Sequence, residues 1–359
     1  MTNKKPDILV IGAGIIGAAC AYYLSREGAR VTVIDSGGPG GVATPASFAW
    51  INASWGNPEP YFRLRREAMA EWRRLAAALP KLQIGFNGGL CWDMAPDEMS
   101  VYLREHNAWG YGIRRVDRDA AARLEPRLTD PPDVAVHVAE EGAVEPRAAA
   151  LTTLSAAERQ GARFIAGTAV RGLILRGNRV EGALTDAGEV HADEVLLAAG
   201  AASPDIAATA GVTLPLTTPP GLLVTSRPHE RLLNGLVMAP DLHMRQTAGG
   251  RIVAGADFGG SDPRTDADAT AHAVFGKLQS MLSGGERLVM EGYSTGYRPT
   301  PVDGFPAIGR PKGPHGIYIA VMHSGITLAP AVGRFAAEEL LQGRRDPLLA
   351  PYGPSRFTP

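Results

Sequence analysis

Apolar residues at the start of the chain fall into short runs separated by glycines and polar positions. The first run is Asp7 to Ile11, and a run of this length next to a turn is typical of a buried strand. Helical spacing follows over residues 18–27, and Gly28 stands where a helix would end. A second apolar run, Val31 to Ile34, leads to Asp35. The pattern predicts a strand, a turn, a helix and a second strand.

Further along, the same patterns predict a mixture of helices and strands. Helices are expected over about 59–78, 97–109, 118–125, 146–160, 267–282 and 329–341. Strands are expected at 89–94 and 316–321, in alternating runs over 163–200 with turns at 177–178 and 187–188, and across 215–298. We therefore expect an α/β protein (α+β overall) with a discontinuous Rossmann-like dinucleotide domain and an interleaved, mostly antiparallel sheet domain for the substrate. The expected dinucleotide domain takes residues 1–85, 146–214 and 299–359, and the substrate domain takes 86–145 and 215–298.

Composition and charge narrow the classes of function. The chain has 359 residues, 45% hydrophobic and 20% charged, which suits a globular protein with a substantial core. A net charge of −1 without basic runs argues against nucleic acid or an anionic membrane as partner. Cys20 and Cys91 have no metal-ligand spacing, so no metal site is expected. The first residues lack a signal-type apolar core and no apolar run reaches about 18 residues, so we expect a cytoplasmic protein without a membrane span. The sequence leaves open whether the chain forms a homo-oligomer.

Three glycines between the first strand and the first helix carry the clearest chemistry. Gly12, Gly14 and Gly17 have GxGxxG spacing, which permits a tight turn, close approach of a pyrophosphate, and close packing of helix on strand. The N-terminus of the helix then faces the phosphates. Asp35 is placed to accept hydrogen bonds from a ribose. The unit predicts dinucleotide binding, and by itself it leaves NAD and FAD open.

Several later segments resemble one family over nearly the whole chain. They are EEGAVEPRAA (140–149), TAV (168–170), LLAAGAAS (196–203), GGRIVAGAD (249–257), GYRPTPVDGFPAIG (296–309) and VMHSGITLAPAVG (321–333). With GAGIIG they resemble FAD-dependent amino-acid and amine oxidases of the D-amino-acid oxidase and glycine/sarcosine oxidase type, the DAO family. The resemblance selects FAD over NAD, and an NAD-dependent dehydrogenase is the weaker alternative.

The resemblance implies a cofactor site assembled from both ends of the chain. The expected FAD-binding residues are Gly12, Gly14, Ile15, Ile16, Gly17, Asp35, Ser36, Ala43, Thr44, Ser47, Val170, Ala199, Gly200, Arg298, Ser324, Gly325, Ile326 and Thr327. A helix starting at Gly325 would present N–H groups to the pyrimidine edge of a reduced, negatively charged flavin. Covalent members of the family use a cysteine near the Arg298 motif or a histidine in the N-terminal loop. Neither is found in this sequence, so non-covalent FAD is expected.

Arg298 is implied as the residue that binds a substrate carboxylate, because a guanidinium matches two carboxylate oxygens and stays charged. A structural ion pair is the alternative for it. His323 is a candidate contact to substrate or flavin, or else a hydrogen-bonded turn histidine. His243 stands where glycine-oxidase-like relatives place a carboxylate-binding tyrosine, and Arg245 would face the same side of a strand. Trp50, Asn52 and Trp55 line the substrate side or belong to the core. Catalytic roles are expected for Arg298, His323 and His243, and a turn-capping role for Asp303.

The resulting hypothesis is oxidation of the C–N bond of a small amine or amino acid that carries a carboxylate: a D-amino acid, a glycine-like or an N-alkyl amino acid. A hydride moves to flavin N5, and the imine that forms is hydrolysed. No side-chain base is required if the amine binds neutral. Molecular oxygen is the favoured acceptor, although residues 251–257 contain no lysine of the kind that assists oxygen in some relatives, which keeps a dehydrogenase open. Oxidation of a 2-hydroxy acid also stays open, as does a role as the flavin-binding subunit of a larger amine dehydrogenase.

Overall fold

The computed structural model describes residues 5–54, 56–256, 261–263 and 266–358. The structural statements below refer to these residues, and Trp55 and Asp257 lie outside them. The α-helices are α1 (Ile15–Arg26), α2 (Glu59–Ala78), α3 (Pro96–Ala108), α4 (Arg118–Leu124), α5 (Pro146–Arg159), α6 (Ser203–Ala208), α7 (Ala267–Met281) and α8 (Gly325–Gln342). Short 3-10 helices cover Gly200–Ala202, Gly285–Arg287, Pro347–Tyr352 and Pro354–Phe357.

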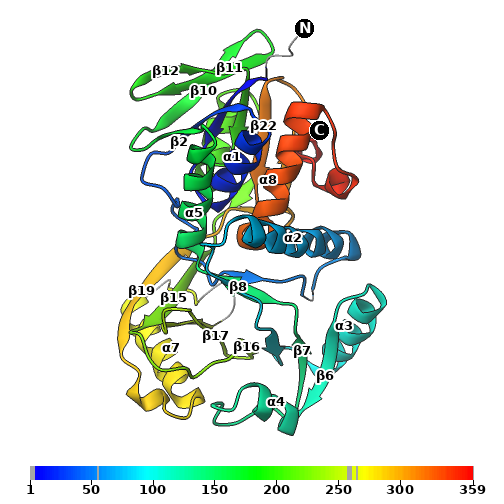
Figure 1. The fold of residues 1–359 in the computed structure, drawn as a ribbon, viewed down its shortest axis with the longest axis vertical. Helices are drawn as coiled ribbons and strands as arrows, with labels where there is room; N and C mark the ends of the chain where they lie inside the picture. The colour runs from blue at the N-terminus through cyan, green and yellow to red at the C-terminus, as the bar shows by residue number, and fades with distance from the viewer. Residues whose placement is uncertain (1–4, 55, 257–260, 264–265, 359) are drawn as a thin grey trace.

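A six-stranded sheet forms the centre of the upper half of the molecule (Figure 1). Its order is β21 (Ala307–Gly309), β22 (Ile317–Val321), β13 (Glu194–Leu197), β1 (Asp7–Ile11), β2 (Arg30–Ile34) and β9 (Arg163–Ile165). Every neighbouring pair is parallel except β21 with β22. This is the sheet that the strand–helix–strand pattern predicted.

Both faces of this sheet are buried, which explains why its strands are continuously apolar. Along β1, Ile8 and Val10 pack into a core with α1, α5 and α8, whereas Leu9 and Ile11 pack into a second core on the opposite face. The opposite face is covered by α6 and by the antiparallel sheet β10 (Val170–Arg176), β11 (Arg179–Thr185) and β12 (Gly188–His191). The two faces alternate because successive side chains of a strand point to opposite sides.

A second large sheet fills the lower half (Figure 1). Its order is β19 (Met290–Tyr297), β15 (Pro220–Ser226), β18 (Ile252–Gly255), β17 (Leu242–Gln246), β16 (Leu236–Ala239), β5 (Gly89–Cys91), β7 (Val134–Val138) and β6 (Ile113–Asp117). The pairs are antiparallel except β16 with β5. One face packs against α7 through residues such as Met244 and Phe275. The alternate residues, such as His243, therefore project from the other face.

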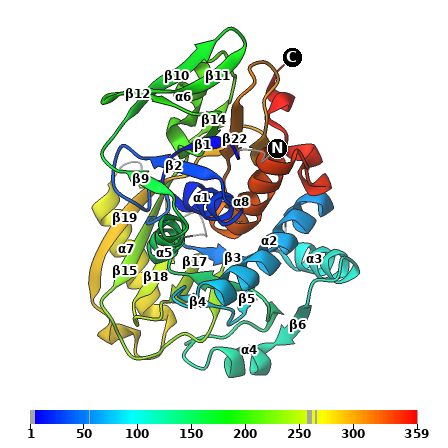
Figure 2. The ribbon, with the colours of Figure 1, turned by 45° about the horizontal axis from the view of Figure 1, so that its top comes forward.

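Small sheets link the two halves. β8 (Gly142–Val144) pairs with β3 (Trp50–Ile51) and β4 (Ile84–Gly85), and β14 (Leu216–Thr217) pairs with β20 (Thr300–Pro301). Helix α2 lies between the halves, beside α8 (Figure 2). The mixed fold class is confirmed, with a Rossmann-like sheet and a mostly antiparallel one. The exact ranges of the two domains stay a prediction, because these small pairings join segments assigned to different domains.

Two expected elements differ from the structure at their ends. The strand expected over 89–94 ends at Cys91, and the last helix begins at Gly325, as the resemblance implied, and not at about residue 329, where periodicity placed it. The early start places Pro330 inside α8, where a proline cannot donate to the carbonyl of Ile326. The indole Nε1 of Trp72 in α2 donates to that carbonyl at 2.8 Å instead. A side chain from another helix therefore compensates for the proline.

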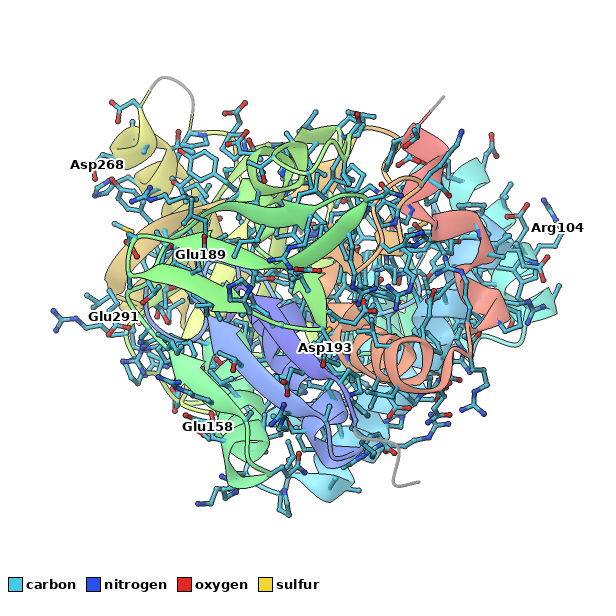
Figure 3. The ribbon with its side chains drawn as sticks, turned by 90° about the horizontal axis from the view of Figure 1, so that it is seen from above. Arg104, Glu158, Glu189, Asp193, Asp268 and Glu291 are labelled. Atoms are coloured by element: carbon cyan, nitrogen blue, oxygen red, sulfur yellow. The ribbon has the colours of Figure 1, made fainter. Side chains whose placement is uncertain are left out.

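Charged groups of both signs lie over many elements of the surface, as the labelled side chains Arg104, Glu158 and Asp268 show at the rim of the view in Figure 3. No described helix combines the length and the apolar character that crossing a membrane requires.

Candidate active site

The glycine turn between β1 and α1 is closely packed, which explains its sequence. Gly12 has φ +105°, and a Cβ atom there would lie 2.4 Å from the carbonyl oxygen of Ala198. A Cβ atom on Gly17 would lie 1.8 Å from the carbonyl oxygen of Gly12. The first residue of α1, Ile15, donates its N–H to Thr44 Oγ1 at 3.1 Å, which ties the loop after β2 to the start of the helix. The turn therefore tolerates no side chain at Gly12 or Gly17.

Asp35 follows β2 and lies beside this turn. Its carboxylate accepts the Ala13 N–H at 2.7 Å and the Gly37 N–H at 2.8 Å. These bonds hold the carboxylate at the carboxyl edge of the parallel sheet, where dinucleotides bind in open α/β sheets. Its position agrees with a ribose contact, which stays a prediction.

A cavity of about 910 Å³ extends from the glycine turn to the face of the large sheet opposite α7. Its size is at the upper end for ligand pockets, which run to roughly 1,000 Å³. Of the residues predicted for cofactor and substrate, all line this cavity except Gly17, which packs beneath the turn, and Arg245. Segments from both ends of the chain therefore meet at one cavity. Cys91 also lines it, so non-covalent attachment of the cofactor stays a prediction.

The start of α8 forms part of the cavity wall. Ser324 precedes the helix with φ +55°, a left-handed conformation that is uncommon for a residue with a side chain. Its hydroxyl accepts from Arg65 Nη1 at 3.2 Å and lies 3.0 Å from His323 Nδ1. Thr327, in the first turn, donates to the carbonyl of Trp50 at 3.0 Å. These bonds hold the N-terminus of α8 toward the cavity, where its dipole favours negative charge.

His323 is held by this same chain of hydrogen bonds. Its Nε2 lies 2.6 Å from the carbonyl oxygen of Gly304, so Nε2 carries the proton and Nδ1 accepts from Ser324. Burial, and next the charge of Arg65, lower the pKa of His323 to about 4, so the ring is neutral at pH 7. Both ring nitrogens are thus engaged within the protein. The structure favours the turn-histidine interpretation, and we drop His323 from the catalytic set.

Arg298 follows β19 and lines the cavity, and its side chain makes no hydrogen bond within the described residues. Its backbone N–H donates to Pro219 at 3.2 Å, which holds the residue at the end of the strand. Its side-chain Nε is buried and has no hydrogen-bond partner among the described residues. No carboxylate of the described chain forms an ion pair with it. A buried, unsatisfied guanidinium donor is costly, and a ligand carboxylate in the cavity would satisfy it.

Arg65 is a cavity residue that the sequence patterns did not reveal. Only 6% of it is exposed, although it carries a charge. Its guanidinium donates to the backbone and side chain of Asn52 and to Ser324, and no carboxylate of the described residues forms an ion pair with it. The available signal was its place in α2, on the apolar stripe of Tyr61 and Trp72. A buried cation on the cavity wall makes this end of the cavity electropositive.

Of the two predicted substrate contacts on β17, His243 lines the cavity and Arg245 does not. His243 lines the cavity and donates from Nε2 to Asp93 Oδ2 at 2.8 Å. Arg245 lies on the same face of β17, but its guanidinium donates to Glu145 at 3.0 Å and to the carbonyl of Phe48 at 2.5 Å. Arg245 does not line the cavity, because its ion pair with the partly exposed Glu145 directs it elsewhere. We therefore do not include it in the substrate site.

Trp50 and Asn52 both line the cavity, and Trp50 is held from behind by a buried carboxylate. The indole Nε1 of Trp50 donates to Glu141 at 2.9 Å, and the hydroxyls of Ser54 and Tyr111 donate to the same carboxylate. Burial raises the pKa of Glu141 to about 7, against the opposing effect of these hydrogen bonds.

Asp303 accepts the Phe305 N–H, as expected for a turn residue, and it also pairs with Arg356.

Glu141 makes the stability of the protein depend on pH. Its folded pKa of about 7 is above its ordinary value of 4.5, so its contribution is fully present below pH 4.5 and is lost as the pH rises through 7. A shift of this size corresponds to roughly 3 kcal/mol. We expect Glu141→Gln, which mimics the protonated acid, to become more stable relative to the parent protein by up to that amount between pH 5 and pH 8. Urea unfolding at both values measures it. The exposed-site control Glu286→Gln should show no such trend, and a Glu141→Gln difference that is constant with pH would contradict the assignment.

Comparisons with known proteins agree with this arrangement. The model of the family described as DAO, FAD dependent oxidoreductase, matches residues 7–339. An uncharacterized oxidoreductase of Bacillus subtilis, YurR, is 30% identical, over 97% of this chain and 98% of its own. A glycine oxidase of Pseudomonas aeruginosa is 28% identical, over 97% of this chain and 98% of its own. The solved structure of an L-proline dehydrogenase from P. horikoshii has the same fold, with a TM-score of 0.89 and 24% identity over 99% of this chain and 98% of that one. This chain therefore belongs to the DAO family of FAD-dependent oxidoreductases, and its cofactor is FAD.

Proposed function

We propose that the protein oxidises the C–N bond of a small amino acid or N-alkyl amino acid and binds the substrate carboxylate with Arg298. The observation that carries the proposal is that Arg298 lines the cavity while its side chain, including the buried Nε, has no hydrogen-bond or ion-pair partner among the described residues. An arginine fork binds a carboxylate with two parallel hydrogen bonds, and this fixes the orientation of the bound molecule. Relatives named for activity on amino acids, such as the glycine oxidase, support the substrate class.

The residues that line the cavity fit FAD. The glycine turn leaves room for a pyrophosphate at the start of α1, and Asp35 offers a carboxylate at the ribose position. Ser324 to Thr327 offer a second helix N-terminus, and Arg65 adds a buried positive charge beside it. When bound, FAD supplies the two-electron acceptor for the reaction. The helix start and Arg65 would favour the negative charge that the cofactor gains on reduction.

The contribution of the protein in this proposal is mainly positioning. Arg298 holds the carboxylate, and the walls restrict the orientation of the carbon that loses hydrogen. Oxidation removes a hydride from that carbon and a proton from the nitrogen, which leaves an imine. Water hydrolyses the imine to a carbonyl compound and ammonia or an amine. The substrate amine binds neutral, so no side-chain base is required.

The proposal also concerns the molecule that accepts the electrons from the reduced flavin. We favour molecular oxygen, with a dehydrogenase as the alternative because residues 251–257 contain no lysine. The L-proline dehydrogenase with the same fold is a reason to test both. Oxidation of a 2-hydroxy acid is separated from amine oxidation by ammonia release, since an alcohol yields none.

The experiment is anaerobic bleaching of the flavin by D-, L- and N-methyl amino acids, followed by admission of air. We expect at least one amino acid to bleach the flavin and air to restore its colour within seconds. Bleaching without reoxidation by air would support the dehydrogenase. Bound flavin that no amine or amino acid reduces would contradict the proposed function and favour a non-catalytic subunit.

A further inference from the structure

The cavity has a second charged group on the face of the large sheet, of opposite sign to Arg298. Among the described residues that line the cavity, the acidic ones are Asp35 and Asp93. Asp35 belongs to the glycine turn. Asp93 follows β5, on the sheet side, and 31% of its side chain is exposed. The part of the cavity away from the glycine turn thus contains the cations Arg65 and Arg298 and one carboxylate, Asp93.

His243 orients this carboxylate. Its Nε2–H donates to Asp93 Oδ2 at 2.8 Å, and His243 itself is only 2% exposed. The ring also packs near Phe48, with centroids 6.4 Å apart, so its position is restricted. A carboxylate that is partly removed from water and bordered by apolar groups gains most from a cationic partner.

The order of strands separates Arg298 from Asp93. Arg298 follows the edge strand β19, and Asp93 follows β5, with β15, β18, β17 and β16 between these strands. Neighbouring strands lie about 4.8 Å apart, so the two residues are attached to well-separated parts of the sheet. Leu223 on β15 and Met238 on β16 line the cavity between them, and both are buried. The wall therefore offers a cation, an apolar stretch and an anion in sequence.

We propose that Asp93, oriented by His243, is a subsite for a cationic group at the end of the substrate's side chain. The inference rests on the proposed function and names its substrate class: amino acids whose aliphatic side chain ends in an ammonium or guanidinium group. Arg298 takes the carboxylate, Leu223 and Met238 contact the aliphatic chain, and Asp93 takes the distal cation. Amino acids with an acidic side chain are disfavoured by repulsion from Asp93.

The test uses two carboxylates that lack an α-amine and differ only in a terminal ammonium: valerate and δ-aminovalerate. Each is titrated anaerobically into the flavin-loaded protein, and the perturbation of the flavin absorption band gives the dissociation constant. We expect δ-aminovalerate to bind about 10- to 100-fold more tightly than valerate, the range for a hydrogen bond to a charged group. In Asp93→Asn, which keeps the shape and removes the charge, the two ligands should bind within about threefold of each other.

Asp241→Asn is the matched control, because Asp241 lies in the turn between β16 and β17, has a side chain that is 71% exposed and pairs with Lys277. It should keep the preference of the parent protein. Equal affinities in the parent protein, or a preference that survives Asp93→Asn, would overturn the cation subsite while valerate binding still supports the Arg298 site. If neither ligand binds, the carboxylate site fails and the subsite fails with it.

Turnover gives a second measurement. Arginine and citrulline have nearly the same shape, and only arginine carries a cation. We expect kcat/KM for arginine, in the enantiomer that is oxidised, to exceed that for citrulline by at least tenfold, and Asp93→Asn to abolish the difference. Oxidation of other amino acids without a preference for arginine would contradict the subsite and leave the proposed function standing.

Discussion

Replacement of Arg298 by methionine is expected to lower kcat/KM for amino acids by about 30- to 4,000-fold while the protein still binds FAD. The range corresponds to about 2–5 kcal/mol, the cost of removing one partner of a buried, hydrogen-bonded charge pair. The reason is that the Nε of Arg298 is buried without another partner in the described structure, so a substrate carboxylate would be its main ligand. Stopped-flow reduction of the flavin under anaerobic conditions measures the effect.

Matched variants separate carboxylate binding from a general effect of charge. Arg298→Lys keeps the charge and loses the two-pronged geometry, so it should recover only part of the rate. Arg251→Met removes an arginine next to β18 whose side chain is 43% exposed and pairs with Glu291, and it should change kcat/KM by less than about threefold. An amine substrate without a carboxylate should react equally with the parent protein and with Arg298→Met. Loss of activity on both kinds of substrate would contradict the assigned role.

Replacement of Gly17 by alanine is expected to abolish FAD binding or folding. The added Cβ would lie 1.8 Å from the carbonyl oxygen of Gly12, so the backbone of the turn must move. Overpacking of this kind costs about 1–3 kcal/mol or more, and here backbone meets backbone, so we expect at least about 3 kcal/mol. The ratio of flavin to protein absorbance reports FAD binding, and thermal unfolding reports stability.

Gly276 provides the opposite control. It is exposed in the interior of α7, and a Cβ there meets no atom within 4 Å. Alanine is favoured over glycine in a helix by about 1 kcal/mol, so Gly276→Ala should raise stability and keep the flavin. If Gly17→Ala binds FAD as the parent protein does, the close packing assigned to the turn is wrong.

Beside α8, burial and the charge of Arg65 together shift the pKa values of His323 and Glu141. Arg65 is buried, and its positive charge lowers the pKa of His323 and opposes the rise in the pKa of Glu141. His323 is consequently neutral, which suits its hydrogen bonds to Gly304 and Ser324. The positive charge in this part of the site thus belongs to arginines, whose charge does not change with physiological pH.

The parts of the fold that depend on neighbouring residues could be predicted from the sequence. The glycine turn, Asp35 and the helix α2 over Glu59–Ala78 follow local patterns of spacing and periodicity. The placement of Arg298 and Ser324 beside the glycine turn came from resemblance to a family, and the cavity brings these segments together. Periodicity alone placed the end of a short strand and the start of α8 too late, whereas the resemblance implied the helix start at Gly325 that the structure has. Trp72, from a distant segment, donates to the carbonyl that Pro330 inside α8 leaves without its helical donor.

Dinucleotide binding can be predicted from the local sequence, because the residues of that unit are adjacent and their backbone geometry is local. Which polar side chains line the cavity depends instead on how distant segments pack together. Arg65 lies 259 residues from Ser324, and Asp93 lies 150 residues from His243, and each pair meets only when helix and sheet pack together. The same packing directs the guanidinium of Arg245 to Glu145, outside the cavity lining, and engages the ring of His323 with Gly304 while His323 still lines the cavity. Burial and long-range pairing are properties of the whole fold, so spacing along the chain does not encode them locally.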